Sequence, residues 1–62
     1  MKERLYRGFW DDGHDYGEFD YYSTHRNNSK ENLEDAYREY QKRHGRSHKI
    51  KITRTYLVKE IF

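Results

Sequence analysis

The chain has 62 residues, a formal net charge of +2, 39% charged residues and no cysteine. This composition excludes disulfides and thiolate metal sites, and no apolar run approaches the roughly 18–20 residues that span a bilayer. We expect one small, soluble, cytoplasmic domain that has no cofactor, no bound metal and no contact with a membrane.

The first two predicted elements are strands at residues 2–10 and 15–23, which form a hairpin. Asp11, Asp12 and Gly13 suit the turn between them, because short acidic residues and glycine tolerate the backbone angles of tight turns. The register of the pair decides which aromatic side chains lie inside, because a slip of one residue turns a strand over.

A turn closed by a bulge at Gly13 segregates the side chains of the hairpin most cleanly. It predicts that one face carries Leu5, Phe9, Phe19 and Tyr21, and that this face packs on the core. The other face then carries Tyr6, Trp10, Tyr16 and Tyr22. A two-residue turn at Asp12 and Gly13 is the alternative, and it would mix the two sets.

Residues 29–44 are predicted to form a helix. Ser29 is a suitable N-cap, Gly45 suits the left-handed position after the last turn, and basic residues occupy the last turn. The spacing of the apolar residues predicts one buried stripe. Its members are Leu33, Ala36, Tyr37 and Tyr40.

Residues 49–59 are predicted to form the last strand, which has one buried and one exposed face. The even positions supply the buried residues Ile50, Ile52, Tyr56 and Val58. Arg54 interrupts this apolar series, and Leu57 interrupts the polar series at the odd positions.

The predicted fold class is therefore α+β, a single small ββαβ domain covering residues 1–62. We expect a three-stranded antiparallel sheet in the order 2-1-3, with the helix packed on one face. The predicted core consists of the inward residues of the three strands and the helix stripe, which are Leu5, Phe9, Phe19, Tyr21, Leu33, Ala36, Tyr37, Tyr40, Ile50, Ile52, Tyr56 and Val58.

The sheet face away from the helix is the first candidate site. Its predicted partner-binding residues are the four remaining hairpin aromatics, Tyr6, Trp10, Tyr16 and Tyr22. Tyrosine and tryptophan are favoured at the centres of protein interfaces. The same rings beside Lys49, Lys51 and Lys59 would also suit single-stranded nucleic acid, although Glu18 and Asp20 would repel phosphate. Alternatively, the tyrosines only satisfy strand preference.

Two basic segments are candidate phosphate or nucleic-acid sites. Arg26 and Lys30 lie next to the predicted helix N-terminus, where free N–H groups attract anions. The second segment, residues 42–54, contains Lys42, Arg43, Arg46, Lys49, Lys51 and Arg54. An ordinary capping loop and a solvated basic surface are the alternative readings of these two segments.

The charges are also divided along the chain. Residues 1–22 carry three basic and six acidic side chains, whereas residues 23–62 carry ten basic and five acidic ones. Such blocks are most often solvated faces, and the alternatives are a surface for polyanions or a dipolar molecule that pairs head to tail.

Catalysis has little support in the sequence. Asp11, Asp12, His14 and Asp15 could be read as a metal or hydrolytic cluster, but acidic residues at an exposed hairpin tip usually form the turn. The four histidines have no spacing typical of a metal site. We expect no enzymatic activity and no small-molecule substrate.

The segment Asn28-Ser29-Lys30-Glu31-Asn32-Leu33-Glu34-Asp35-Ala36, preceded by the Asp-Gly hairpin, resembles small accessory proteins of phages and mobile elements with a ββαβ plan. This resemblance implies either nucleic-acid binding or inhibition of a host defence protein. Together with the aromatic face, it favours a non-catalytic interaction protein that binds a protein partner or a second copy of itself. A nucleic-acid-binding module is the alternative.

Overall fold

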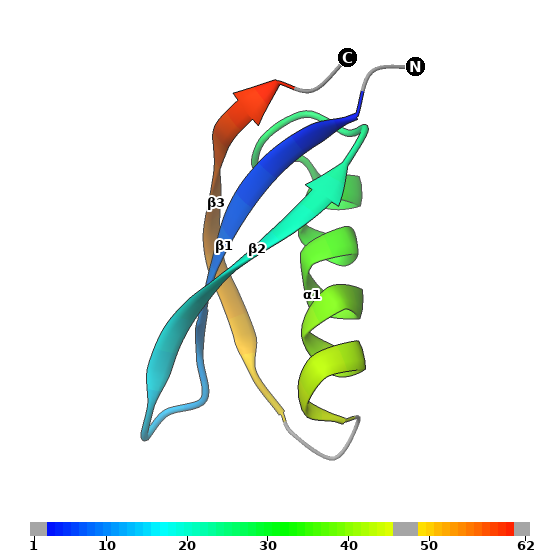
Figure 1. The fold of residues 1–62 in the computed structure, drawn as a ribbon. Coiled ribbons are helices and arrows are strands. Elements are labelled where there is room, and N and C mark those ends of the chain that lie inside the picture. Colours follow the sequence, from blue (N-terminus) through cyan, green and yellow to red (C-terminus); the bar gives the residue numbers. More distant parts are fainter. Residues whose placement is uncertain (1–2, 46–48, 61–62) are drawn as a thin grey trace.

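The computed structural model describes residues 3–45 and 49–60 of the protein (Figure 1). The elements are β1 (Arg4–Asp11), β2 (Tyr16–Ser23), α1 (Lys30–His44) and β3 (Lys51–Glu60). β1 pairs antiparallel with both other strands, so the sheet order is β2-β1-β3. The predicted α+β class and strand order are confirmed. The prediction for the first strand includes residue 2, which lies outside the described residues.

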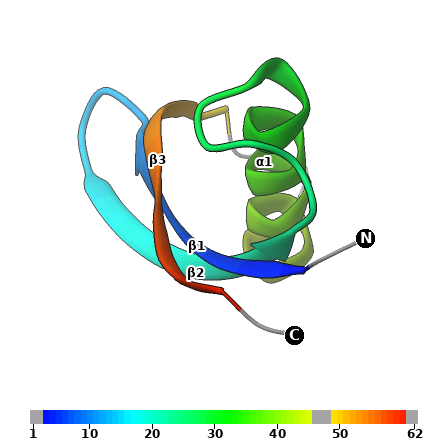
Figure 2. The same ribbon diagram turned by 90° about the horizontal axis from the view of Figure 1, so that it is seen from above.

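The helix α1 covers one side of the curved sheet, as Figure 2 shows. The Ser29 hydroxyl accepts a hydrogen bond from the Asn32 N–H at 3.2 Å and caps the first turn. At the other end Gly45, with a φ of 87°, donates its N–H to the Gln41 carbonyl at 2.8 Å. Within the described residues, no helix or strand covers the opposite side of the sheet.

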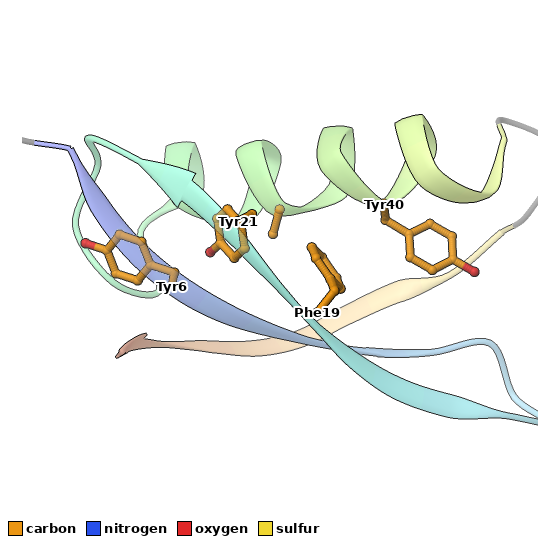
Figure 3. Packing of buried hydrophobic residues seen from close by; sticks show 5 residues of the cluster. Tyr6, Phe19, Tyr21 and Tyr40 are labelled. Carbon is orange, nitrogen blue, oxygen red and sulfur yellow. The ribbon is translucent and has the colours of Figure 1, made fainter. Parts of the chain in front are cut away.

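The core between α1 and the sheet is built almost entirely from aromatic rings. The buried hydrophobic residues are Tyr6, Phe19, Tyr21, Ala36 and Tyr40 (Figure 3). The partly buried side chains of Trp10, Ile50 and Ile52 pack against them. The Phe19 and Tyr21 rings lie 5.6 Å apart between centroids, a separation typical of favourable aromatic pairs. The rings thus replace the aliphatic core that the polar composition lacks.

The hairpin register differs from the predicted one. Residues 12–15 form the connection, in which the Asp12 N–H donates to the Asp15 carbonyl at 3.0 Å. As a result Tyr6 lies opposite Tyr21, and Gly8 lies opposite Phe19. The prediction for β2 holds, but β1 is turned over, so its helix side carries Tyr6, Gly8 and Trp10. Leu5 and Phe9 are not core residues, because they lie on the uncovered side.

Two glycines explain why this register is preferred. A Cβ atom at Gly8 would lie 3.2 Å from the rings of both Phe19 and Tyr21. A Cβ atom at Gly17 would lie only 2.9 Å from the Trp10 indole. Because glycine has no side chain, both positions leave room for large rings between the sheet and α1.

β3 also departs from its predicted alternation. Its register against β1 shifts twice, between Phe9 and Trp10 and between Leu5 and Tyr6. Each shift inserts one extra β3 residue and therefore reverses the facing of the following side chains. Thr55 is consequently buried, whereas Tyr56 and Val58, which the sequence places in the core, are exposed.

The buried face of α1 is centred on a polar residue. Asn32 is completely buried, in line with Ala36 and Tyr40, whereas the predicted stripe members Leu33 and Tyr37 are only half-buried. The Asn32 side-chain carbonyl accepts a hydrogen bond from the Tyr21 hydroxyl, and its amide donates to the His25 carbonyl at 3.0 Å. This pairing turns α1 slightly from the face that apolar spacing predicts.

Candidate functional site: the open face of the sheet

The open face is the side of the sheet opposite α1. Successive side chains of a strand alternate between the two sides, so the residues next to the core positions lie here. The residues of the open face are Leu5, Arg7, Phe9 and Asp11 of β1, Tyr16, Glu18, Asp20 and Tyr22 of β2, and Lys51, Arg54, Tyr56 and Lys59 of β3. The Tyr16 and Tyr22 side chains are 84% and 57% exposed.

An arginine that contacts two neighbouring aromatic rings marks the β3 side of this face. The Arg54 guanidinium carbon lies 4.6 Å from the centroid of the Phe9 ring and 5.9 Å from that of Tyr56. The two rings are themselves 5.5 Å apart. Cation–π contacts of this kind hold a long side chain in place without neutralising its charge. Arg54 is therefore a fixed positive group.

An ion pair crosses the middle of the open face. The Arg7 Nε lies 2.8 Å from one carboxylate oxygen of Asp20, and a second nitrogen lies 3.3 Å from the other. This two-point contact lowers the pKa of Asp20 and raises the pKa of Arg7. Both groups stay charged, but each largely cancels the other.

The charges of the open face are divided between its outer strands. β2 contributes two carboxylates and no cation, whereas β3 contributes three cations and no carboxylate. Four rows cross the sheet from β2 through β1 to β3, and they are Tyr22, Leu5 and Lys59; Asp20, Arg7 and Tyr56; Glu18, Phe9 and Arg54; and Tyr16, Asp11 and Lys51.

At the free edge of each outer strand, a side chain from another part of the chain forms a hydrogen bond with a backbone group of the strand. On β2, the Arg43 guanidinium from α1 donates to the Asp20 carbonyl at 2.8 Å. On β3, the Thr55 N–H donates to the side-chain oxygen of Asn28 at 2.9 Å, and the Asn28 N–H returns a bond to the Thr55 hydroxyl at 3.1 Å. Occupied edge groups hinder pairing with a strand of another chain.

Of the four predicted partner-binding residues, the structure brings only two to the open face. Tyr16 and Tyr22 lie there, but Tyr6 is 2% exposed and Trp10 packs against Tyr40 with ring centroids 5.2 Å apart. The placement of Tyr6 and Trp10 on this face is therefore wrong.

Sequence reasoning did not place Phe9, Arg54 and Tyr56 on the open face, although it counted Arg54 in the basic segment 42–54. Phe9 changes sides with the register of β1, and the other two change sides at a bulge in β3. Two signals were available in the sequence. Gly8 occupies an even position of β1, as do the buried aromatic residues Tyr6 and Trp10, and Arg54 breaks the alternation of β3.

The predicted phosphate-binding residues do not form one surface. Arg26 and Lys30 are exposed near the start of α1, and Lys42 is exposed near its end, about 18 Å further along a helix that rises about 1.5 Å per residue. Arg43 is engaged by the Glu39 carboxylate and by the β2 edge. Lys49 and Lys51 are exposed at the start of β3, and Arg46 lies outside the described residues.

The acidic hairpin tip is occupied by its own turn. The Asp12 carboxylate accepts hydrogen bonds from the N–H groups of His14 and Asp15, and the Asp11 carboxylate accepts one from Gly13. Among residues 3–45 and 49–60, no group of three His, Cys, Asp or Glu side chains is placed to hold a metal ion. The helix in this part of the chain is too short and too polar to cross a bilayer.

A separate hollow lies between α1 and β3, away from the open face. Its lining includes Leu33 and Tyr37 of α1 and Ile52 of β3, with the charged residues Lys30, Glu34 and Arg38 also present. Its charges are of both signs and interspersed. This hollow supplies positions for control substitutions, because changes there do not touch the open face.

Comparison with protein-family models, curated proteins and solved structures finds no match to this chain. The resemblance to accessory proteins of phages and mobile elements stays a prediction. The geometry of the open face therefore carries the functional argument alone.

Proposed function

We propose that this protein is a non-catalytic binding module whose contact surface for a protein partner is the open face. The observation that carries the proposal is the gathering of Phe9, Tyr16, Tyr22 and Tyr56 on a face that no described element covers. Exposed groups of aromatic residues together with arginine are typical of interface centres.

The two sheet edges support contact through the face rather than through strand addition. The hydrogen bonds of Asn28 on β3 and of Arg43 on β2 occupy backbone groups that an added strand would need. A partner that met the open face would disturb neither contact.

The charges of the open face favour a protein over a nucleic acid. Nucleic-acid affinity comes mainly from cations on phosphates. Here Glu18 and Asp20 lie on the same face, and Asp20 already pairs with Arg7. The β3 side is nevertheless suited to a single-stranded nucleic acid, because Arg54 lies beside the tilted pair of rings of Phe9 and Tyr56. Single-stranded nucleic acid is therefore the second candidate.

Affinity capture with a face variant tests the proposal. The native protein and Tyr16→Ser/Tyr22→Ser are each immobilised and exposed to a nuclease-treated extract of the cells that make the protein. We expect a protein retained by the native chain and lost with the double variant. Tyr37→Ser, which changes an aromatic residue of the separate hollow, is the matched control and should retain it. Equal retention by the native chain and the double variant contradicts the proposal.

Fluorescence anisotropy with labelled single-stranded oligonucleotides separates the two candidates. Protein binding predicts no salt-dependent complex at low ionic strength. A complex that weakens steeply with salt and is lost in Arg54→Ala would establish the nucleic-acid alternative instead.

A further inference from the structure

The division of charge across the open face restricts how two copies of the chain could meet. Two identical sheets that stack face to face are related by a twofold axis lying between them. An axis across the strands places β2 over β2 and β3 over β3, so like charges meet. An axis along β1 places the acidic β2 of each copy over the basic β3 of the other.

We infer that the partner of the open face is a second copy of this chain, and that the twofold axis of the dimer runs along β1. The inference rests on the proposed function, because it identifies the protein that the face binds. Its support is that Glu18 of β2 and Arg54 of β3 share a row, so the axis along β1 brings this carboxylate and this cation together at two symmetric contacts.

The pairing rows predict the individual contacts. An axis along the strands preserves the position of each row, so each β2 residue meets the β3 residue of its own row in the other copy. Glu18 then lies opposite Arg54 of the second copy, and Asp20 lies opposite the hydroxyl of Tyr56. In the end rows, the rings of Tyr22 and Tyr16 meet the ammonium groups of Lys59 and Lys51, as in cation–π pairs.

Leu5, Arg7 and Phe9 of β1 are compatible with a position on the axis, whereas the Asp11 carboxylate would meet that of the second copy at the end of the contact. Leu5 and Phe9 would meet their own copies and supply the apolar centre of the contact. Arg7 would also approach its copy, but its charge is already balanced by Asp20 at 2.8 Å. The aligned packing of sheets, about 30° apart and separated by about 10 Å, accommodates this arrangement.

The size of the face sets the expected strength of the dimer. Three strands about 4.8 Å apart and eight residues long span roughly 14 Å by 26 Å. A standard interface buries about 800 Å² per partner, and the whole chain exposes 4745 Å². The footprint of this face is less than half of that standard area, so the dimer should be weak, reversible and concentration-dependent.

A charge exchange tests both the partner and the axis. Sedimentation of the native protein up to about 1 mM should show a monomer–dimer equilibrium. Glu18→Lys alone and Arg54→Glu alone each place like charges at both symmetric contacts, and each should raise the dimer Kd roughly tenfold. An equimolar mixture of the two variants restores opposite charges at both contacts, so it should dimerise with nearly native affinity.

The controls keep the outcomes separate. Glu34→Lys makes the same charge change on α1 and should leave the dimer unchanged, and circular dichroism of each variant reports folding. Failure of the mixture to recover overturns the axis along β1. A native protein that stays monomeric overturns the second copy as partner. In that case the capture experiment decides the proposed function, which requires that a different protein is retained.

Discussion

The substitution Asn32→Leu should destabilise the fold because it leaves the buried hydroxyl of Tyr21 without its hydrogen-bond acceptor. Asn32 and Tyr21 are both buried, and the Tyr21 hydroxyl donates to the Asn32 side-chain oxygen. Leucine removes that acceptor at similar volume. The His25 carbonyl keeps a donor, because the Tyr6 hydroxyl bonds to it at 2.8 Å. The group that loses its hydrogen-bond partner is therefore mainly the Tyr21 hydroxyl.

Its magnitude follows from the cost of a buried polar group that loses its partner. For a buried group such as the Tyr21 hydroxyl, that cost is about 1–3 kcal/mol. A chain of 62 residues has a free energy of unfolding of roughly 3–9 kcal/mol. The substitution should therefore remove a sizeable fraction of the stability.

Urea denaturation of a double-mutant cycle measures the effect. Unfolding is followed by the fluorescence of Trp10, the one tryptophan of the chain. Tyr21→Phe and Asn32→Leu should each be destabilising, and the double variant should be less destabilised than the sum by about 1 kcal/mol, because it leaves neither polar group unpaired. Additivity of the two single effects to within about 0.4 kcal/mol would refute the reasoning.

Three further predictions test the packing, the helix start and the pH response. Gly17→Ala should lower the free energy of unfolding by about 1–3 kcal/mol and shift the fluorescence of Trp10, because its Cβ atom would lie 2.9 Å from the indole; an unchanged spectrum contradicts this contact. Ser29→Ala should cost about 1 kcal/mol in urea denaturation and Ser29→Asp almost nothing; equal losses would refute capping. Burial raises the pKa of Tyr21 from 10.0 to about 12, so this hydroxyl ionises at a lower pH in the unfolded chain than in the folded one. The stability present below pH 10 should therefore be lost as the pH rises toward 12. Tyr21→Phe should lack this pH-dependent loss of stability, and matching pH profiles of the two proteins would contradict it.

The order of the elements could be predicted from the sequence, but the facing of β1 could not be settled by apolar pattern alone. Both sets of alternate positions in β1 carry large hydrophobic residues, Leu5 and Phe9 on one side and Tyr6 and Trp10 on the other. The choice depends on the glycines, since only Gly8 and Gly17 leave space for rings against the sheet. That requirement becomes visible only when the facing strand and α1 are in place.

Two irregularities in the sequence of β3 indicated which of its side chains face the core. Arg54 and Leu57 both break the expected alternation. Strict alternation treats them as exceptions, whereas the structure shows that the register shifts around them. Thr55 then turns inward, where its backbone and hydroxyl bond to Asn28. A bulge cannot be located from one strand, because it is a property of the pairing between two strands.

The burial of Asn32 lay beyond sequence reasoning for a different reason. An asparagine in the first turn of a helix is ordinarily read as a solvent-exposed or capping residue. Its burial here depends on two partners that approach from elsewhere, the hydroxyl of Tyr21 and the carbonyl of His25. The residue four positions on, Ala36, is also completely buried and lies on the same side of α1.

The aromatic character of the open face survives the change of register, although its members change. Tyr16 and Tyr22 remain, and Phe9 and Tyr56 replace Tyr6 and Trp10. The acidic segment 1–22 and the basic segment 23–62 meet in the sheet, because β1 lies between β2 and β3. The division of charge along the sequence thus becomes a division of charge across the open face. Such a surface complements a second copy that is rotated about the axis along β1.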